Sequence, residues 1–317
     1  MSLASILFLL AIFVTLFKAP TAQPAPRWLG PYSVNSRWYN VSALDRTNPS
    51  ALVVYPSNGT GPFPLISYLH GFLGGGIDLI GYVDLFGQIA SYGFVVVAPD
   101  SCNTGCTDPS QGAPWSDCAG LPEPTCCGSQ YSPWYAEGLK VIDWAKNMSD
   151  AKQDPLFQLI DWSQGVGFAG HSMGGQAAVI AANAACTSRW NIRAVVVHHP
   201  APGSLWTGQN LGVNISVPTV VFTSSGDTMC PPSWSKDIMN AIPNSTRPIA
   251  YRNEVGWSHL EPVLVPPIEN PLLATFTAAW FKLYVSGDAS WHSTIYGNGP
   301  ATLCGEASQV ECWATET

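Results

Sequence analysis

Short apolar runs alternate with longer segments of helical spacing through most of this 317-residue chain. The short runs are rich in β-branched residues and end at Gly, Pro, Asp or Ser, which is typical of buried strands followed by turns. The strands predicted in this way are 51–55, 65–69, 94–98, 166–169, 194–197, 219–222 and 249–253. The helices predicted between and after them are 80–92, 133–147, 173–185, 233–241 and 272–284. The alternation predicts an α/β fold with a mostly parallel central sheet flanked by helices.

One segment, 101–133, interrupts this alternation. It is long, rich in Gly, Pro and Cys, and has no clear period. A loop of this length in a compact domain is usually functional or held by disulfides. Because it follows a predicted strand, we expect a cysteine-rich insertion at the carboxyl edge of the sheet, where α/β proteins collect their functional side chains.

The chain begins with an apolar run, residues 3–17, which is followed by Lys18, small residues and prolines. Such a run is typical of a signal peptide and is shorter than the ~20 apolar residues that span a bilayer. We therefore expect residues 1–22 to be a cleaved signal peptide and 23–317 to be a single secreted domain, without a membrane span after cleavage. An uncleaved anchor is the alternative, because no Lys or Arg precedes the run and Pro20 lies just before the expected cleavage site.

Cysteine content supports an oxidising compartment. The chain has nine cysteines, so at least one is free or pairs with another chain. Cys304 and Cys312 are predicted to form a disulfide, and the cysteines between 102 and 127 to hold the insertion together. A zinc site in that segment is the disfavoured alternative, because no neighbouring histidine supports it. Secretion by a eukaryote would glycosylate the Asn-X-Ser/Thr tripeptides, which lie at Asn40, Asn58, Asn147, Asn214 and Asn244.

The charge of the chain argues against nucleic-acid partners. Its net charge is −8, it has only 13 Lys and Arg, and these residues form no basic cluster. Nucleic-acid binding depends on Lys and Arg that neutralise phosphates, so no nucleic-acid partner is expected, and large anionic substrates are disfavoured for the same reason.

Hydrophobic residues make up 46% of the chain, which is enough for a sizeable core.

A serine stands between two glycines in the sequence GHSMG at residues 170–174. This pattern alone is weak evidence, and a glycine-rich packing turn is the alternative. Here, however, an apolar strand precedes the serine and an Ala-rich helix follows it, as in a nucleophile elbow. We therefore predict that Ser172 is a nucleophile. A serine hydroxyl then needs a histidine base, and the base needs a carboxylate to orient it.

Two later loops supply an acid and a histidine in the chain order that such a fold requires. Asp227 follows the predicted strand 219–222, and His259 follows the next strand, 249–253. Both residues therefore belong to the same edge of the sheet as Ser172. We predict a catalytic triad of Ser172, His259 and Asp227.

Other acids and histidines are weaker candidates for these roles. His292 lies beyond the last long helix, and Glu254 and Glu261 would each have to bend back against their own strand to replace the acid. His198 and His199 precede the predicted acid and so break the expected order; a structural role, or a place in the lining of the pocket, is expected for them.

Backbone N–H groups should stabilise the oxyanion. One is expected from Met173, directly after the nucleophile, and the other from Phe72 in the glycine-rich loop HGFLGGG, which His70 would support. Aromatic side chains are predicted to line an apolar substrate site, namely Phe72, Trp206 and Trp257. No metal or organic cofactor is needed for this chemistry.

At these residues the chain resembles two groups of α/β-hydrolases. The blocks LHGFLGGG, ASYGFVVVAPD and GHSMGG look like segments of the chlorophyllase family. The blocks GHSMGG, PTVVFTSSGDTMCPP, GWSHLEP and AWFKLYVSGD, and a cysteine-bearing tail, occur in the order found in cutinases and poly(ethylene terephthalate) (PET) hydrolases. The resemblance spans residues 51–312. It implies the α/β-hydrolase fold and a serine-esterase triad and oxyanion hole at the residues named above.

The chain also departs from both groups. Gly203 stands where polyester hydrolases tend to carry an aromatic residue, unless Trp206 takes its place. Chlorophyllases have their acid soon after the strand that follows the nucleophile, whereas VVVHHPAPGSLW contains no acid, which places the acid at Asp227. The cysteine-rich insertion is absent from both patterns and is expected to narrow or cover the cleft.

Taken together, these features predict a secreted serine carboxylic-ester hydrolase that forms an acyl-enzyme on small or polymeric apolar esters. A chlorophyllase-like esterase that cleaves a long-chain alcohol ester is the first alternative, and a peptidase of the same fold is another. A non-catalytic binding protein with a hydrolase fold is the alternative from another functional class. The oligomeric state and the natural ester are left open.

Overall fold

A computed structural model describes residues 29–42, 44, 50–71, 76–100, 133–202, 210–246, 248–264, 266 and 269–316. The predicted signal peptide and nearly all of the cysteine-rich insertion lie outside these residues. Phe72 and Trp206 also lie outside them.

The described residues form a nine-stranded sheet with the strand order β1-β2-β4-β3-β5-β6-β7-β8-β9. The strands are β1 (Val34–Asn40), β2 (Ser50–Pro56), β3 (Leu65–Leu69), β4 (Val95–Pro99), β5 (Val166–His171), β6 (Ile192–His198), β7 (Thr219–Ser224), β8 (Ile249–Glu254) and β9 (Gln309–Thr315). Strands β4, β3, β5, β6, β7 and β8 pair in parallel, whereas β1, β2 and β9 pair antiparallel. The carboxyl ends of β3 and β5 to β8 therefore share one edge.

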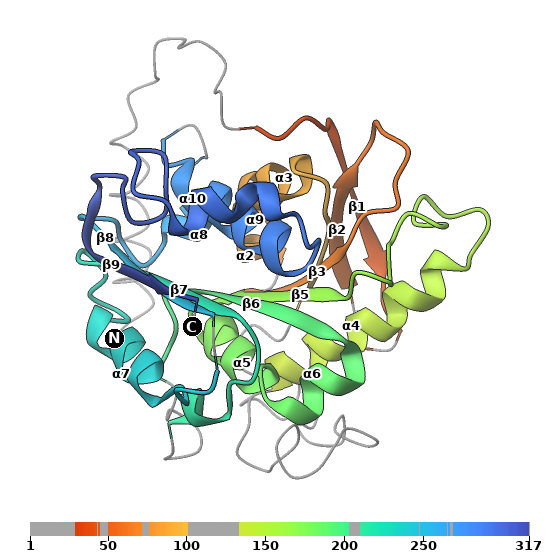
Figure 1. The fold of residues 1–317 in the computed structure, drawn as a ribbon. Coiled ribbons are helices and arrows are strands. Elements are labelled where there is room, and N and C mark those ends of the chain that lie inside the picture. Colours follow the sequence, from red (N-terminus) through yellow and green to blue (C-terminus); the bar gives the residue numbers. More distant parts are fainter. Residues whose placement is uncertain are drawn as a thin grey trace, which may run out of the picture.

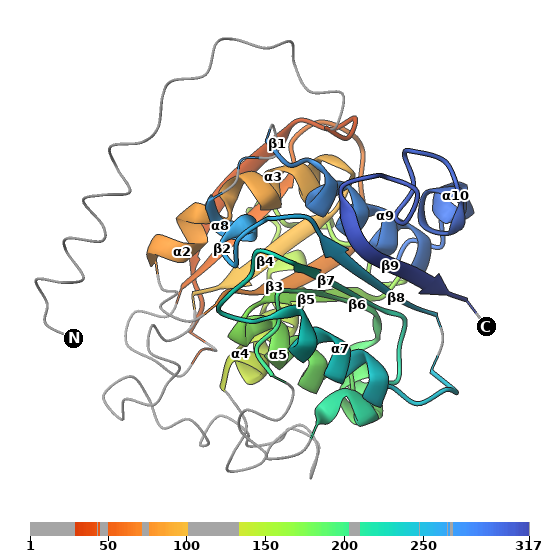
Figure 2. The same cartoon turned by 90° about the vertical axis from the view of Figure 1, so that its left-hand side faces the viewer.

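Helices cover both faces of this sheet (Figures 1 and 2). They are α2 (Gly76–Gly81), α3 (Val83–Ser91), α4 (Pro133–Ser149), α5 (Met173–Ala181), α6 (Ala184–Trp190), α7 (Pro232–Ala241), α8 (Glu261–Leu264), α9 (Leu272–Tyr284) and α10 (His292–Tyr296), with 3-10 turns at Leu211–Asn214 and Ala289–Trp291. One core cluster packs α4 to α7 against one face, and a second packs α3, α9 and α10 against the other. These layers are those of the α/β-hydrolase fold, which confirms the predicted fold class.

All of the predicted strands are present, to within two residues at each end. The strands that the sequence analysis missed are β1 and β9, which lie at the two edges of the sheet. Each leaves most of its side chains exposed or partly exposed, so neither has the continuous apolar run that reveals a strand buried on both faces.

Two of the predicted helices are interrupted. The helix predicted over 173–185 is two helices, because α5 ends at Ala181. The Asn183 side chain then accepts hydrogen bonds from the N–H groups of Ala185 and Cys186 and so caps a new helix, α6. The prediction 80–92 is divided between α2 and α3, which meet at Tyr82. α2 begins four residues before the predicted start, at the last glycine of the run GGG.

The C-terminal residues close the far edge of the sheet beside β8. The predicted disulfide between Cys304 and Cys312 is present and ties the start of this segment to β9. Arg252 of β8 is fully buried and donates hydrogen bonds to Glu254, to Glu306 and to the carbonyl of Leu303. These bonds join β8 to the segment that leads into β9.

Within the described part of the chain, no helix is both long enough and apolar enough to cross a membrane.

Candidate active site

Ser172 occupies the sharp turn between β5 and α5. Its backbone has φ = 56°, a left-handed conformation that side-chain-bearing residues rarely adopt. The flanking glycines allow this turn to pack closely. A β-carbon on Gly170 would lie 2.2 Å from the carbonyl oxygen of Gly174, and one on Gly174 would lie 2.3 Å from that of Leu69. Close main-chain approach therefore explains both glycines of the pentapeptide.

The structure brings Ser172, His259 and Asp227 together at the carboxyl edge of the sheet. Ser172 Oγ lies 2.9 Å from His259 Nε2, and His259 Nδ1 lies 2.8 Å from Asp227 Oδ2. A carboxylate only accepts hydrogen bonds, so Nδ1 donates to Asp227 and Nε2 is left to accept the serine O–H. All three side chains are at least nine-tenths buried.

Asp227 is held by four hydrogen bonds. Its Oδ1 accepts from the N–H groups of Met229 at 2.9 Å and Cys230 at 2.7 Å, and its Oδ2 accepts from His199 as well as His259. Burial opposes ionisation, but the bonds from His199 and His259 outweigh it and hold the pKa of Asp227 well below its usual range. Asp227 is therefore a fixed carboxylate.

His199 is a second histidine bonded to Asp227, and it shares the carboxylate oxygen Oδ2 with His259. Its Nδ1 lies 2.9 Å from Asp227 Oδ2, its Nε2 lies 3.0 Å from Glu261 Oε2, and its side chain is fully buried. Burial alone would lower the pKa of His199, but the hydrogen bonds to Asp227 and Glu261 raise it to about 9. From the sequence alone, only a structural or pocket-lining role was predicted for this residue.

His171, the second residue of the pentapeptide, joins the nucleophile turn to the histidine loop. Its Nε2 donates to the carbonyl of His259 at 2.8 Å, and its Nδ1 accepts from the Tyr82 hydroxyl, which also accepts from the N–H of Gly71. Burial, together with the neighbouring histidines, lowers the pKa of His171 well below its usual range, so the ring is neutral. Neither His171 nor Tyr82 was predicted from the sequence to have a role, and the pentapeptide that contains His171 was the only signal for it.

Of the two predicted oxyanion donors, the structure describes Met173. It is the first residue of α5, where N–H groups have no partner within the helix. Phe72 lies outside the described residues, but the preceding Gly71 lies against the nucleophile, since a β-carbon there would be 3.1 Å from Ser172 Cβ. The glycine-rich loop therefore leaves β3 beside Ser172.

The side chains of His292, His198, Glu254 and Glu261 all bond groups other than Ser172, His259 and Asp227. His292 is half-exposed and bonds Glu316 at 3.1 Å. His198 bonds the Tyr68 hydroxyl and the Thr277 hydroxyl, and burial, followed by the charge of His199, lowers its pKa to about 3. Glu254 is bound by Arg252 and by Asn270 rather than by His259, and Glu261 reaches His199 instead.

Of the predicted aromatic lining, Trp257 is described, and it is partly buried in the loop that carries His259. Two apolar side chains that the sequence analysis did not single out lie on the acid and histidine loops and are exposed. Met229, two residues after Asp227, is 62% exposed, and Leu260, next to His259, is 38% exposed. The loops that carry the acid and the histidine therefore present apolar side chains to solvent.

A free thiol also adjoins the cluster. Cys230 is buried and unpaired, and its Sγ lies 3.9 Å from His259 Nε2. Burial and the neighbouring Asp227 raise the pKa of the Cys230 thiol to about 12. The thiol therefore stays protonated and, despite its position, is a poor nucleophile.

The raised pKa of Cys230 predicts resistance to alkylation. At pH 8 only about one thiol in 10⁴ is ionised, so iodoacetamide should leave Cys230 unmodified in the folded protein and modify it after denaturation. Mass spectrometry of the peptide that contains Cys230 measures both states. Rapid alkylation of the folded protein would show instead that His259 takes the thiol proton.

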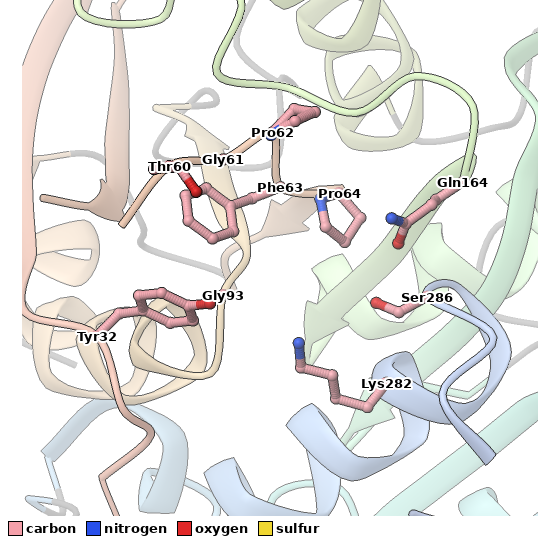
Figure 3. A pocket seen from close by; sticks show the side chains of 10 residues that line it. All are labelled: Tyr32, Thr60, Gly61, Pro62, Phe63, Pro64, Gly93, Gln164, Lys282 and Ser286. Carbon is pink, nitrogen blue, oxygen red and sulfur yellow. The ribbon is translucent and has the colours of Figure 1, made fainter. Parts of the chain in front are cut away.

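A cavity of about 240 Å³ lies at the opposite edge of the sheet, where β3, β4 and β5 begin. Figure 3 shows Lys282 of α9 extending into this cavity, with Tyr32 and Phe63 on one side and Gln164 on the other. None of the residues that line it belongs to the Ser172–His259–Asp227 cluster. The cavity is therefore separate from the candidate active site.

The ligand atoms of His199, Asp227 and His259 lie within 4.8 Å of one another, a spacing that a metal ion can use. In this arrangement, however, the same atoms bond one another, because Asp227 Oδ2 accepts from both imidazoles. A metal ion would have to replace both of these hydrogen bonds. The arrangement is suited to positioning a proton-accepting imidazole beside a serine hydroxyl.

Comparison with protein families agrees with this geometry. Residues 126–312, more than half of the chain, match the PET hydrolase-like family, and residues 29–113 match the chlorophyllase family. No curated protein matches the sequence. Both families consist of carboxylic-ester hydrolases with the α/β-hydrolase fold, as the sequence blocks predicted. The chain belongs to the PET hydrolase-like family and is a carboxylic-ester hydrolase.

Proposed function

We propose that the protein is a secreted serine esterase that cleaves apolar esters through Ser172, His259 and Asp227. The observation that carries the proposal is the continuous hydrogen-bond chain from Ser172 Oγ through the His259 ring to Asp227 Oδ2. Each of the three follows a different strand, so the sheet itself fixes their positions. His171 also ties the nucleophile turn to the histidine loop at this edge.

In the first half of the proposed reaction, Ser172 Oγ attacks the ester carbonyl while His259 Nε2 takes the serine proton. Asp227 stabilises the resulting imidazolium, and the N–H of Met173, with that of Phe72, binds the oxyanion. His259 then gives the proton to the departing alcohol. In the second half, His259 deprotonates a water molecule, which attacks the acyl-serine and releases the acid.

Apolar esters are the substrate class that the surroundings of the site support. Trp257, Met229 and Leu260 lie on the two loops that carry the acid and the base, and the last two are exposed. Apolar side chains beside a reacting carbonyl favour an acyl or alcohol group without charge. The net charge of −8 disfavours anionic substrates further.

Secretion is supported by three features. The apolar N-terminal run suits a signal peptide over residues 1–22. The disulfide between Cys304 and Cys312 suits an oxidising compartment. All five asparagines of the Asn-X-Ser/Thr tripeptides are exposed, as glycosylation requires.

A chlorophyllase-like activity is the second candidate, and the family match over residues 29–113 favours it. That match covers the loop expected to carry Phe72 but neither Ser172 nor the loops of Asp227 and His259. The absence of an acid after β6 in the sequence remains the argument for a simpler ester substrate.

A fluorophosphonate probe and a graded panel of esters test the proposal. The purified protein should take up one equivalent of probe, located at Ser172 by peptide mapping, because only an activated serine attacks phosphorus at neutral pH. It should hydrolyse nitrophenyl esters of short and medium acyl chains and leave chlorophyll intact.

The outcomes separate the alternatives. Folded protein that stays unlabelled and inactive on every ester would support a non-catalytic binding protein. Labelled protein that prefers chlorophyll would support the chlorophyllase-like candidate. Labelling at a serine other than Ser172 would refute the proposed nucleophile while leaving the esterase assignment intact.

A further inference from the structure

A second buried histidine is bonded to the acid of the proposed triad. Both ring nitrogens of His199 lie within 3.0 Å of a carboxylate oxygen, from Asp227 on one side and Glu261 on the other. Asp227 Oδ1 already accepts two backbone N–H groups, and the other oxygen of Glu261 accepts from the Asn270 amide. The hydrogen bonds to the two carboxyl groups raise the pKa of His199 to about 9, so both ring nitrogens carry protons at neutral pH and donate to these oxygens.

The backbone of His199 is also unusual. Its φ is 44°, one of four positive φ values at non-glycine positions in the described residues, and another of these is Ser172. Such a conformation costs free energy and persists where the surroundings fix it, often beside an active site. The His199 N–H bonds the carbonyl of Phe222 at 2.8 Å, and the side chain bonds Asp227.

The elements around His199 bring several ionisable groups close to it. Asp227 follows β7, Glu261 begins α8, and the rings of His259 and His171 lie with their centroids 6.0 and 6.1 Å away. The neighbouring His198 is neutral, because its pKa is lowered to about 3. Farther out, Arg252 and Asn270 bind Glu254, whose pKa is raised by burial and by Glu261, and the protonated Cys230 thiol adjoins Asp227.

We propose that His199, held between Asp227 and Glu261, is a positioning residue of the esterase that fixes Asp227 and lowers the pH at which the acidic limb of the kcat/KM profile lies. The inference rests on the proposed function of Ser172, His259 and Asp227. Its physical basis is electrostatic. The negative charge of Asp227 attracts a proton to the His259 ring, and the His199 cation, bonded to the same carboxylate oxygen, offsets part of that attraction. His199 is fully buried, so it acts through Asp227.

The sign of the effect follows from charge. Replacing His199 by Gln removes a cation, so His259 takes up a proton at higher pH and the acidic limb of the kcat/KM profile moves upward. Two unit charges about 6 Å apart in a medium of effective dielectric constant ~20 shift a titration by about two pH units. Protonation of Glu254, whose pKa is raised to about 7 by burial and by Glu261, would offset part of this, so we expect a shift of about one pH unit.

Replacing Glu261 by Gln should move the same limb in the opposite direction. The glutamine amide would keep an oxygen that accepts from His199 Nε2 but would remove a negative charge, so His259 would lose its proton at lower pH. Ionisation of Glu254 would then restore part of that charge, and we expect a downward shift of about half a pH unit. General destabilisation cannot produce shifts of opposite sign.

The experiment measures kcat and KM on a nitrophenyl ester from pH 4 to 10 for the wild type, H199Q, E261Q and H198Q. Thermal melting at each pH establishes that every variant is folded. H199Q should lower plateau kcat about 10-fold with little change in KM. H198Q is the matched control, because His198 is adjacent to His199 and equally buried but neutral. Its replacement should leave the acidic limb of the kcat/KM profile at the same pH as in the wild type.

A measurement on the wild type keeps the inference testable if H199Q fails to fold. In ¹⁵N-resolved NMR of the histidine side chains, both ring nitrogens of His199 should carry protons from pH 6 up to about 9. Loss of either proton below pH 7, or parallel shifts in H199Q and E261Q, would overturn the inference. Wild-type turnover by Ser172→Ala would instead overturn the proposed function, so the two failures are distinguishable.

Discussion

Ser172→Ala is expected to lower kcat for a nitrophenyl ester by about 10⁵-fold or more, with little change in KM. The substitution removes the attacking oxygen and leaves His259 Nε2 without its 2.9 Å partner. No neighbouring group can replace the serine, because the Cys230 thiol has a pKa of about 12 and stays protonated. Residual turnover should come from the oxyanion donors and from substrate binding alone.

Ser235→Ala provides the matched control. Ser235 of α7 is fully buried, and its hydroxyl has no hydrogen-bond partner among the described residues, so its loss should leave both activity and folding unchanged. Steady-state kinetics on both variants, with thermal melts to verify folding, make the comparison. Turnover by Ser172→Ala at the wild-type rate would exclude Ser172 as the nucleophile.

His259→Ala should reduce kcat to a similar extent, because Ser172 then lacks the group that takes its proton. The double variant Ser172→Ala, His259→Ala should be hardly less active than either single variant, since residues that act as one unit give non-additive losses. Kinetics of the three variants on one ester measure this. Additive losses would indicate that the two residues act independently.

His292→Ala is the control for this second prediction. His259 and His292 are the histidines that follow Asp227 in the sequence, but His292 is half-exposed and bonded to Glu316. Its removal should leave kcat nearly unchanged. The reverse result, an inactive His292→Ala and an active His259→Ala, would transfer the role of base to His292.

The strands at the centre of the sheet could be predicted because a strand buried on both faces has a continuous run of apolar residues in the sequence. The runs VVVA of β4 and TVVF of β7 are apolar with hardly an interruption, and each ends at a turn residue. The edge strands β1 and β9 have no such run, since polar and apolar residues are mixed along each of them. Their pairing depends on partners that no local pattern reveals.

The candidate triad could be predicted because its members follow strands in a fixed chain order. The same rule gave no partner for His199, which precedes the acid and was expected to be structural or to line the pocket. Its contact with Asp227 depends on β6 pairing with β7, and its contact with Glu261 depends on where α8 lies. Neither placement has a local signal in the sequence. His171 was missed for a similar reason, since its partners are Tyr82 and the His259 carbonyl.

The C-terminal segment beside β8 has a consequence for how the enzyme is made. The ribosome adds residues 303–315 well after His259, yet these residues supply the partner strand of β8 and the bonds that hold the buried guanidinium of Arg252. β8 leads directly into the loop of His259. A nascent chain that has just exposed His259 already contains every residue of the proposed triad but not the strand that supports its base. We therefore expect the segment from β8 to His259 to reach its final structure only after residues 303–315 have been made.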